Sequence, residues 1–180
     1  MPQKQNKFCI KPFNSVFLDT DGRIATCCAI EPDPKFNIKT HSFKDFWDSD
    51  YRKKLLNAFL NKEQPKECQE CWYDEERGFK SERQFANTEY GVMGNKSPAE
   101  YLELLKKNDI SHPEDYNLNI TNLCNLKCYM CVGKSSSKLL VENNDLGIHK
   151  LNQSDYDISN ERLDQLMEEI VQNNVTVITL

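Results

Sequence analysis

Eight cysteines, most of them closely spaced, constrain more than any other feature what this chain can fold into. They are Cys9, Cys27, Cys28, Cys68, Cys71, Cys124, Cys128 and Cys131. At this cysteine content a C-x2-C pair is expected by chance about 0.35 times, but the triplet C-x3-C-x2-C only about 0.015 times. In a reducing compartment such spacings indicate metal binding or catalysis, whereas in a secreted chain they would indicate disulfides.

Charge and hydrophobic patterning exclude several classes of protein. The 180 residues carry 23 basic and 28 acidic side chains, a formal net charge of -5, which argues against a general nucleic-acid binder. No apolar run approaches the roughly 18 residues that a membrane span needs. Residues 1–7 contain no apolar signal segment. We therefore expect a cytoplasmic protein that binds neither nucleic acid nor membrane.

A hairpin is predicted near the amino terminus. Residues 16–18 and 23–26 form strand-like runs, and Asp19-Thr20-Asp21-Gly22 between them is typical of a tight turn. A calcium loop is the rival interpretation of the two aspartates. It fails because, with Gly22 at the sixth position, the twelfth position is Cys28 instead of glutamate.

Helical patterns fill most of the next seventy residues. Ser42 precedes one that runs to about Leu60, with an aromatic stripe that we interpret as a core face. A second, charged helix is predicted from Trp72 to about Ala86, with the acidic run 74–76 on its solvated face. Residues 91–95 read as a linker, and Ser97 as the N-cap of a further helix.

The last third predicts a parallel β-α-β unit. Residues 116–120 alternate as a strand and run directly into the cysteine triplet, Ser159 caps an amphipathic helix, and residues 175–180 read as a buried strand. One such unit cannot cover both faces of a sheet. We therefore expect the chain to be a fragment of a longer protein or a truncated gene product.

The triplet suits an open iron–sulfur cluster. Soft thiolates select iron–sulfur clusters, zinc or copper(I), and a closed site normally takes four protein ligands. The triplet offers three, with no fourth cysteine or histidine nearby. Three thiolates on a 4Fe-4S cube leave one iron free to bind a substrate or cofactor.

Residues 119–131, Asn-Ile-Thr-Asn-Leu-Cys-Asn-Leu-Lys-Cys-Tyr-Met-Cys, resemble the signature loop of the radical SAM superfamily, in its peptide-modifying branch. The resemblance implies that Cys124, Cys128 and Cys131 hold a 4Fe-4S cluster whose open iron chelates S-adenosylmethionine. One electron into the sulfonium would release methionine and a 5′-deoxyadenosyl radical, which abstracts hydrogen from the substrate.

The resemblance also implies cofactor contacts, which we place at Asn125, Tyr129 and Met130. The residue before the third cysteine is often aromatic in the family and stacks near adenine; here it is Met130, with Tyr129 one place earlier. The family's Gly-Gly-Glu-Pro motif would begin where this sequence ends, at Leu180. The catalytic residues are left unassigned.

The first part resembles the SPASM/twitch auxiliary-cluster domain. The shared features are Cys9-Ile10-Lys11-Pro12-Phe13, Gly22 separated from Cys27 by four residues, Phe43-Lys44-Asp45-Phe46-Trp47, and Glu67-Cys68-Gln69-Glu70-Cys71-Trp72. The resemblance implies an auxiliary 4Fe-4S cluster on Cys9, Cys27, Cys68 and Cys71, in the shorter twitch form. Cys28 could replace Cys27, or be a small buried hydrophobe or spare thiol. A structural zinc site on the same cysteines is the alternative.

Together these features predict a small α+β cysteine-rich twitch-like domain (1–90), a linker with a short helix (91–114) and the β-α-β start of a partial TIM-type radical SAM barrel (115–180). We expect an enzyme that modifies a peptide or protein substrate and takes electrons from a flavodoxin or ferredoxin. The alternative function is a non-catalytic module that binds zinc or a closed iron–sulfur cluster.

Overall fold

The computed structural model describes residues 7–92, 98–107, 110–148, 150–173, 175 and 177–179. Its strands are β1 (Ser15–Leu18), β2 (Ile24–Ala25), β3 (Asp115–Leu118) and β4 (Val177–Thr179). Its α-helices are α1 (Lys11–Asn14), α2 (Phe43–Trp47), α3 (Asp50–Leu60), α4 (Gln69–Glu76), α5 (Glu82–Val92), α6 (Pro98–Lys107), α7 (Ser137–Asp145) and α8 (Asn160–Gln172). Short 3-10 helices are η1 (Lys66–Cys68), η2 (Gly133–Ser135) and η3 (Gln153–Tyr156).

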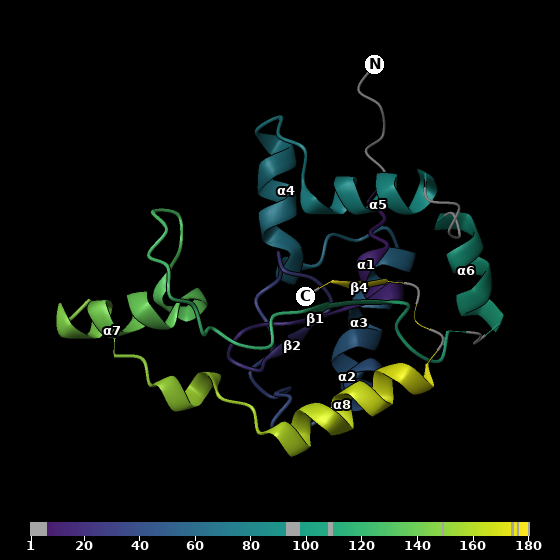
Figure 1. Cartoon of the computed structure of the whole chain (residues 1–180). Coiled ribbons are helices and arrows are strands. Elements are labelled where there is room, and N and C mark those ends of the chain that lie inside the picture. Colours follow the sequence, from purple (N-terminus) through teal and green to yellow (C-terminus); the bar gives the residue numbers. More distant parts are fainter. Residues whose placement is uncertain are drawn as a thin grey trace.

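A mixed sheet in the order β2-β1-β3-β4 forms the centre of the molecule (Figure 1). β1 pairs antiparallel with β2 and parallel with β3, with Ser15 opposite Asp115; β3 pairs parallel with β4. The amino-terminal hairpin and the carboxyl-terminal strands therefore belong to one sheet. The division of the chain at residues 90 and 114 stays a prediction.

The β-α-β expectation is confirmed at the level of elements. The α8 helix lies in the long connection between the parallel strands β3 and β4, and the Ser159 hydroxyl accepts the Arg162 N–H at its start. The expectation that the last strand is buried is wrong for its described residues. β4 is an edge strand, and Ile178 is 45% exposed. Thr176 and Leu180 lie outside the described residues.

The hairpin turn forms as predicted. The Asp19 N–H donates to the Arg23 carbonyl, and the Gly22 N–H donates to the Asp19 carbonyl at 2.8 Å. Gly22 has φ +84°, a left-handed conformation that favours glycine. The turn leads β1 directly into β2.

Each of the two long predicted helices is divided in two, which corrects the sequence interpretation. Residues 42–60 form α2 and α3, because Ser49 acts as a second N-cap and accepts the Arg52 N–H. Residues 69–92 form α4 and α5, separated by a turn at Gly78 with φ +82°. Helix α6 begins at Pro98 as predicted, whereas the proposed cap Ser97 and most of the linker 91–95 lie outside the described residues.

The core joins the two halves of the sequence. The aromatic residues of α2, Phe43, Phe46 and Trp47, pack with Tyr116 of β3 and with Leu166 and Ile170 of α8. The ring centroids of Phe43 and Tyr116 lie 5.3 Å apart. The aromatic stripe is therefore a core face, as predicted.

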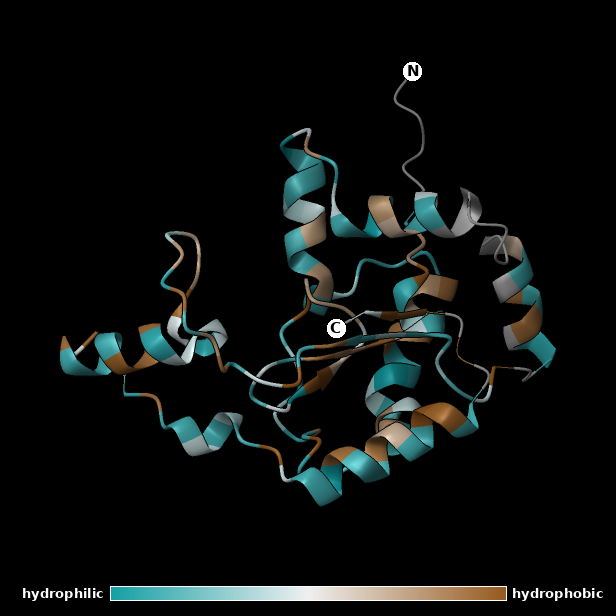
Figure 2. Ribbon diagram, viewed as in Figure 1, coloured by the Kyte–Doolittle hydropathy of each residue, from teal (hydrophilic) through white to brown (hydrophobic). Residues whose placement is uncertain are grey.

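The segment around α7 projects away from this core (Figure 1). Apolar residues occur on it as well (Figure 2), and Leu123, Leu126, Val141 and Leu146 are all more than half exposed. Within the described part of the chain, no helix combines the length and apolar character that crossing a bilayer requires.

Candidate iron–sulfur sites

Four cysteines that lie up to 62 residues apart in sequence line one small cavity. Cys9 precedes α1, Cys27 follows β2, Cys68 ends η1 and Cys71 lies in the first turn and a half of α4. Cys9 and Cys71 are buried, and Cys27 and Cys68 are half-buried. The structure therefore brings together the four cysteines that the SPASM/twitch resemblance named.

Two cationic side chains and one carboxylate complete the cavity wall: Lys11, Arg83 and Glu82. The Lys11 ammonium lies 3.2 Å from a carboxylate oxygen of Asp115 at the start of β3, and both side chains are largely buried. Apolar residues, among them Ile30 and Phe59, line the rest. The cavity thus combines thiols, nearby charged side chains of both signs and apolar walls.

Burial is the main influence on the pKa values of the four cavity thiols. It raises the pKa of Cys9, Cys27 and Cys71, and raises that of Cys68 to about 12. Backbone N–H groups act in the opposite direction: those of Lys11, Ala29 and Arg83 hydrogen-bond to Cys9, Cys27 and Cys71 and lower their pKa. Without a metal the thiols are protonated at neutral pH, whereas metal ligation requires thiolates.

Helix α5 holds the Cys9 segment in place. Arg83 Nη1 and Asn87 Nδ2 both donate to the Phe8 carbonyl, at 2.6 and 2.8 Å, and the Ile10 N–H donates to Asn87. Arg83 also forms a buried ion pair with Glu75. The expectation that residues 74–76 form a solvated face is therefore wrong at Glu75, which is buried because its partner follows across the α4–α5 turn.

Cys28 lies elsewhere. Its side chain is exposed, contrary to the suggestion that it is a buried hydrophobe, and it lines a separate pocket with Asp19, Glu70 and Lys134. Cys27 lies in a bend and Cys28 in the turn that follows it, and of these two adjacent cysteines Cys27 lines the four-cysteine cavity.

The triplet loop follows β3 and is more open. Cys124 is half-buried, while Cys128 and Cys131 are exposed. Serines shape the loop: Ser137 Oγ accepts the Cys124 N–H at 3.2 Å, and Ser136 Oγ donates to the Leu126 carbonyl at 2.8 Å. Among the residues that the structure describes, the four-cysteine cavity included, no group of three or more His, Cys, Asp or Glu side chains is placed so that it could hold a single metal ion.

The three predicted cofactor contacts occupy different environments. Asn125 lines an open hollow with Cys124, Ser137 and Gln153. Tyr129 and Met130 occupy a turn closed by the Cys131 N–H donating to the Cys128 carbonyl, and their side chains are fully or almost fully exposed. Their assignment as cofactor contacts stays a prediction.

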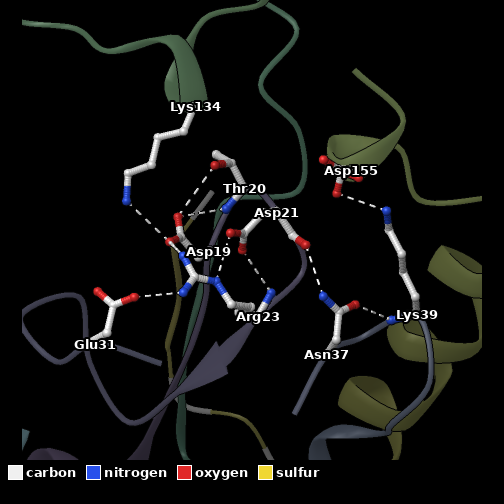
Figure 3. Close-up of polar contacts among 9 residues, drawn as sticks. All are labelled: Asp19, Thr20, Asp21, Arg23, Glu31, Asn37, Lys39, Lys134 and Asp155. Carbon is white, nitrogen blue, oxygen red and sulfur yellow. Dashed lines mark hydrogen bonds and ion pairs between the residues drawn. The ribbon is translucent and has the colours of Figure 1, made fainter. Parts of the chain in front are cut away.

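Polar contacts tie the hairpin turn to the segment that follows the triplet (Figure 3). Lys134 Nζ lies 3.4 Å from Asp19 Oδ2, and Lys39 Nζ donates to the Ser154 and Asp155 carbonyls at 2.8 Å. Arg23 bridges Asp21 and Glu31 at 2.7 Å each. The turn therefore fixes where the projecting segment leaves the sheet.

Sequence reasoning missed Lys11, Glu82 and Arg83 as residues of the cavity wall, and Asp115 as the ion-pair partner of Lys11. Lys11 could have been singled out, because it stands two residues after Cys9, where a backbone N–H commonly approaches a ligating sulfur. Arg83 and Asp115 give no such signal, since tertiary packing alone brings Arg83 to the cavity and Asp115 to Lys11.

Comparison with known families supports the first site. The SPASM family, described as an iron-sulfur cluster-binding domain, matches residues 9–72, roughly a third of the chain. No curated protein and no solved structure shows a significant match. The matched region begins at Cys9 and ends one residue after Cys71. The chain is thus similar to SPASM domains over the segment that supplies all four cavity cysteines, which supports iron–sulfur binding there.

Proposed function

We propose that Cys9, Cys27, Cys68 and Cys71 bind an auxiliary 4Fe-4S cluster. The observation that carries the proposal is that these four cysteines surround one cavity within the region that matches the SPASM family. The donor set fits, because four-cysteine ligation is usual for such clusters. Three sulfurs already accept backbone N–H groups, which favours their ionised form.

We propose further that Cys124, Cys128 and Cys131 hold the cluster of a radical SAM enzyme, with the β-α-β unit of β3, α8 and β4 as part of its barrel. Bound there, cluster and S-adenosylmethionine would together supply a 5′-deoxyadenosyl radical on one-electron reduction. The chain's own residues would hold and orient these two groups. The triplet follows the parallel strand β3, and hydrogen bonds of Ser136 and Ser137 hold the loop backbone. Asn125 lines the same hollow as Cys124. We propose a peptide or protein as the substrate and a flavodoxin or ferredoxin as the electron donor.

Metal analysis tests both sites. The protein is purified anaerobically, reconstituted with iron and sulfide, and analysed for iron, acid-labile sulfide and zinc. About eight iron and eight sulfide per chain support two 4Fe-4S clusters, and about four support one. Stoichiometric zinc with little iron would contradict both proposals and favour a structural metal module.

Adjacent cysteines provide a matched control. Cys27→Ser should remove about four iron, whereas Cys28→Ser should remove none, because only Cys27 lines the cavity. The reverse result would assign the ligand to Cys28.

The triplet is tested separately. In the reconstituted chain, addition of S-adenosylmethionine should alter the EPR spectrum of the reduced protein, and Cys124→Ala should abolish the change. Formation of 5′-deoxyadenosine by the Cys124→Ala protein would show that the triplet is not the site of cleavage.

A further inference from the structure

Tyr51 presents a buried hydroxyl that has no partner among the described residues, on the same apolar cluster as two of the cavity cysteines. It lies in the first turn of α3, and its ring packs against those of Phe36 and Phe46 at centroid distances of 6.4 Å. Its oxygen is shielded from solvent and has no hydrogen-bond partner among the described residues. A buried hydroxyl is normally hydrogen-bonded, so this one calls for an acceptor that the apo chain does not supply.

The neighbours of Tyr51 point to that acceptor. Tyr51 packs with Cys27 and Cys68 against the apolar cluster formed by Phe17, Ala25, Ile30 and Leu55. Burial raises the pKa of the phenol most, and the charges of Cys68 and Cys27 are weaker influences on it. Asp33 and Glu67 act on it as well, yet neither is hydrogen-bonded to it in the described structure.

Cys68 differs from the other three cavity cysteines in the leading influences on the pKa of its thiol. The sulfurs of Cys9, Cys27 and Cys71 each accept a backbone N–H. For Cys68, burial and the charges of Cys27, Cys71 and Glu67 are the leading influences, and a backbone N–H is not among them. Tyr51, which packs on the same apolar cluster as Cys68, carries an O–H donor that has no partner among the described residues.

We propose that the Tyr51 hydroxyl is the fourth donor of this cavity and hydrogen-bonds to the sulfur of Cys68, or to the cluster sulfide next to it, when the cluster is bound. The inference rests on the proposed function, since it needs a cluster on the four cysteines. Hydrogen bonds to ligand or cluster sulfur stabilise the more negative, reduced state and raise the reduction potential. Tyr51 is therefore a positioning and tuning residue for the auxiliary cluster.

Tyr51→Phe tests the inference, with Tyr73→Phe as matched control. Tyr73 lies two residues after Cys71 but is 52% exposed. Both variants are reconstituted and titrated electrochemically with EPR detection. Tyr51→Phe should keep its iron and, at a fixed potential, show a reduced-to-oxidised ratio lowered about five- to tenfold. Tyr73→Phe should match the parent chain. An unchanged ratio in Tyr51→Phe with full iron would overturn the inference.

Apo-chain stability gives a second readout that does not depend on the cluster's potential. Because the variant loses an unsatisfied buried hydroxyl, apo Tyr51→Phe should unfold at the same or a higher urea concentration than the apo parent. With iron bound, the order should reverse. If the variant is less stable in the apo form as well, the hydroxyl has another partner and the inference fails. If the parent chain binds no iron on these four cysteines, the proposed function fails first.

Discussion

The guanidinium of Arg83 donates two hydrogen bonds to the carboxylate of Glu75, of 2.6 Å from Nη2 and 3.0 Å from Nε, and both side chains are almost completely buried. The Ser81 hydroxyl donates to the same carboxylate at 2.6 Å. Arg83 also stacks over the Trp72 ring. The pair thus links α4, which carries Cys71, to α5, which holds the segment of Cys9.

Removing one partner of this pair should be more harmful than removing both. Arg83→Met leaves a buried carboxylate unpaired and should lower the free energy of unfolding by about 3–5 kcal/mol. The double variant Glu75→Met/Arg83→Met should lose less, since no uncompensated charge remains. Urea denaturation of the apo chains measures both, and a double variant less stable than the single one would contradict the prediction.

Gly22 should tolerate a side chain less well than Gly78. Both have a left-handed φ, so alanine costs about 1 kcal/mol at either. A Cβ on Gly22 would also lie 2.9 Å from Asn37 Oδ1, whereas one on Gly78 meets nothing within 4 Å. Gly22→Ala should therefore have the lower urea midpoint. Equal midpoints would show that the Asn37 side chain moves away without cost.

Ser136 should control the order of the triplet loop. It is buried, accepts the Leu139 N–H at the start of α7 and donates to the Leu126 carbonyl. Ser136→Ala should cost about 1–2 kcal/mol locally and speed amide hydrogen exchange in residues 122–131. Ser135→Ala is the control, because Ser135 is exposed. Equal exchange in both variants would show that the loop is ordered by other contacts.

Tyr116 should make stability fall at high pH. Burial, the largest influence, raises the pKa of its phenol to about 12, whereas the hydrogen bond from Asn173 lowers it. Since the folded pKa lies above the ordinary value of 10.0, the unfolded chain loses this proton first. The phenol's contribution to stability is complete below pH 10 and declines as the pH rises toward 12.

The comparison with Tyr116→Phe isolates that effect. Thiols and lysines titrate in both proteins, so their effects cancel in the difference between the two free energies of unfolding. That difference, in favour of the parent chain, should shrink between pH 9 and pH 11.5 as the phenol titrates in the unfolded chain. An advantage that is constant across this range would show that the phenol does not titrate differently in the folded chain.

Local features of the fold could be predicted from the sequence, because neighbouring residues decide them. The turn at Gly22 and the N-cap at Ser159 each depend on side chains within a few positions. The break at Ser49 could not, since the apolar stripe continues across it and conceals the second cap. The burial of Glu75 and the pairing of β1 with β3 depend on partners that only the tertiary structure brings near.

In the candidate sites, too, the sequence identified the cysteines but not the residues that surround them. Spacing and resemblance identified four cysteines that line one cavity. The surroundings of those cysteines were out of reach: Lys11 joins the cavity to Asp115, which lies more than a hundred residues later in the sequence. Adjacent thiols at 27 and 28 are indistinguishable by spacing, and only the path of the chain after β2 separates them.

The parallel pairing of β1 with β3 places the two groups of cysteines toward opposite ends of these strands. The four-cysteine cavity lies near the amino ends of these strands, where Lys11 meets Asp115, and the triplet loop leaves from the carboxyl end of β3. Four strand residues span about 13 Å. The length of β3 therefore separates the two groups of cysteines along the sheet, and substitutions of side chains that keep this pairing leave the separation unchanged.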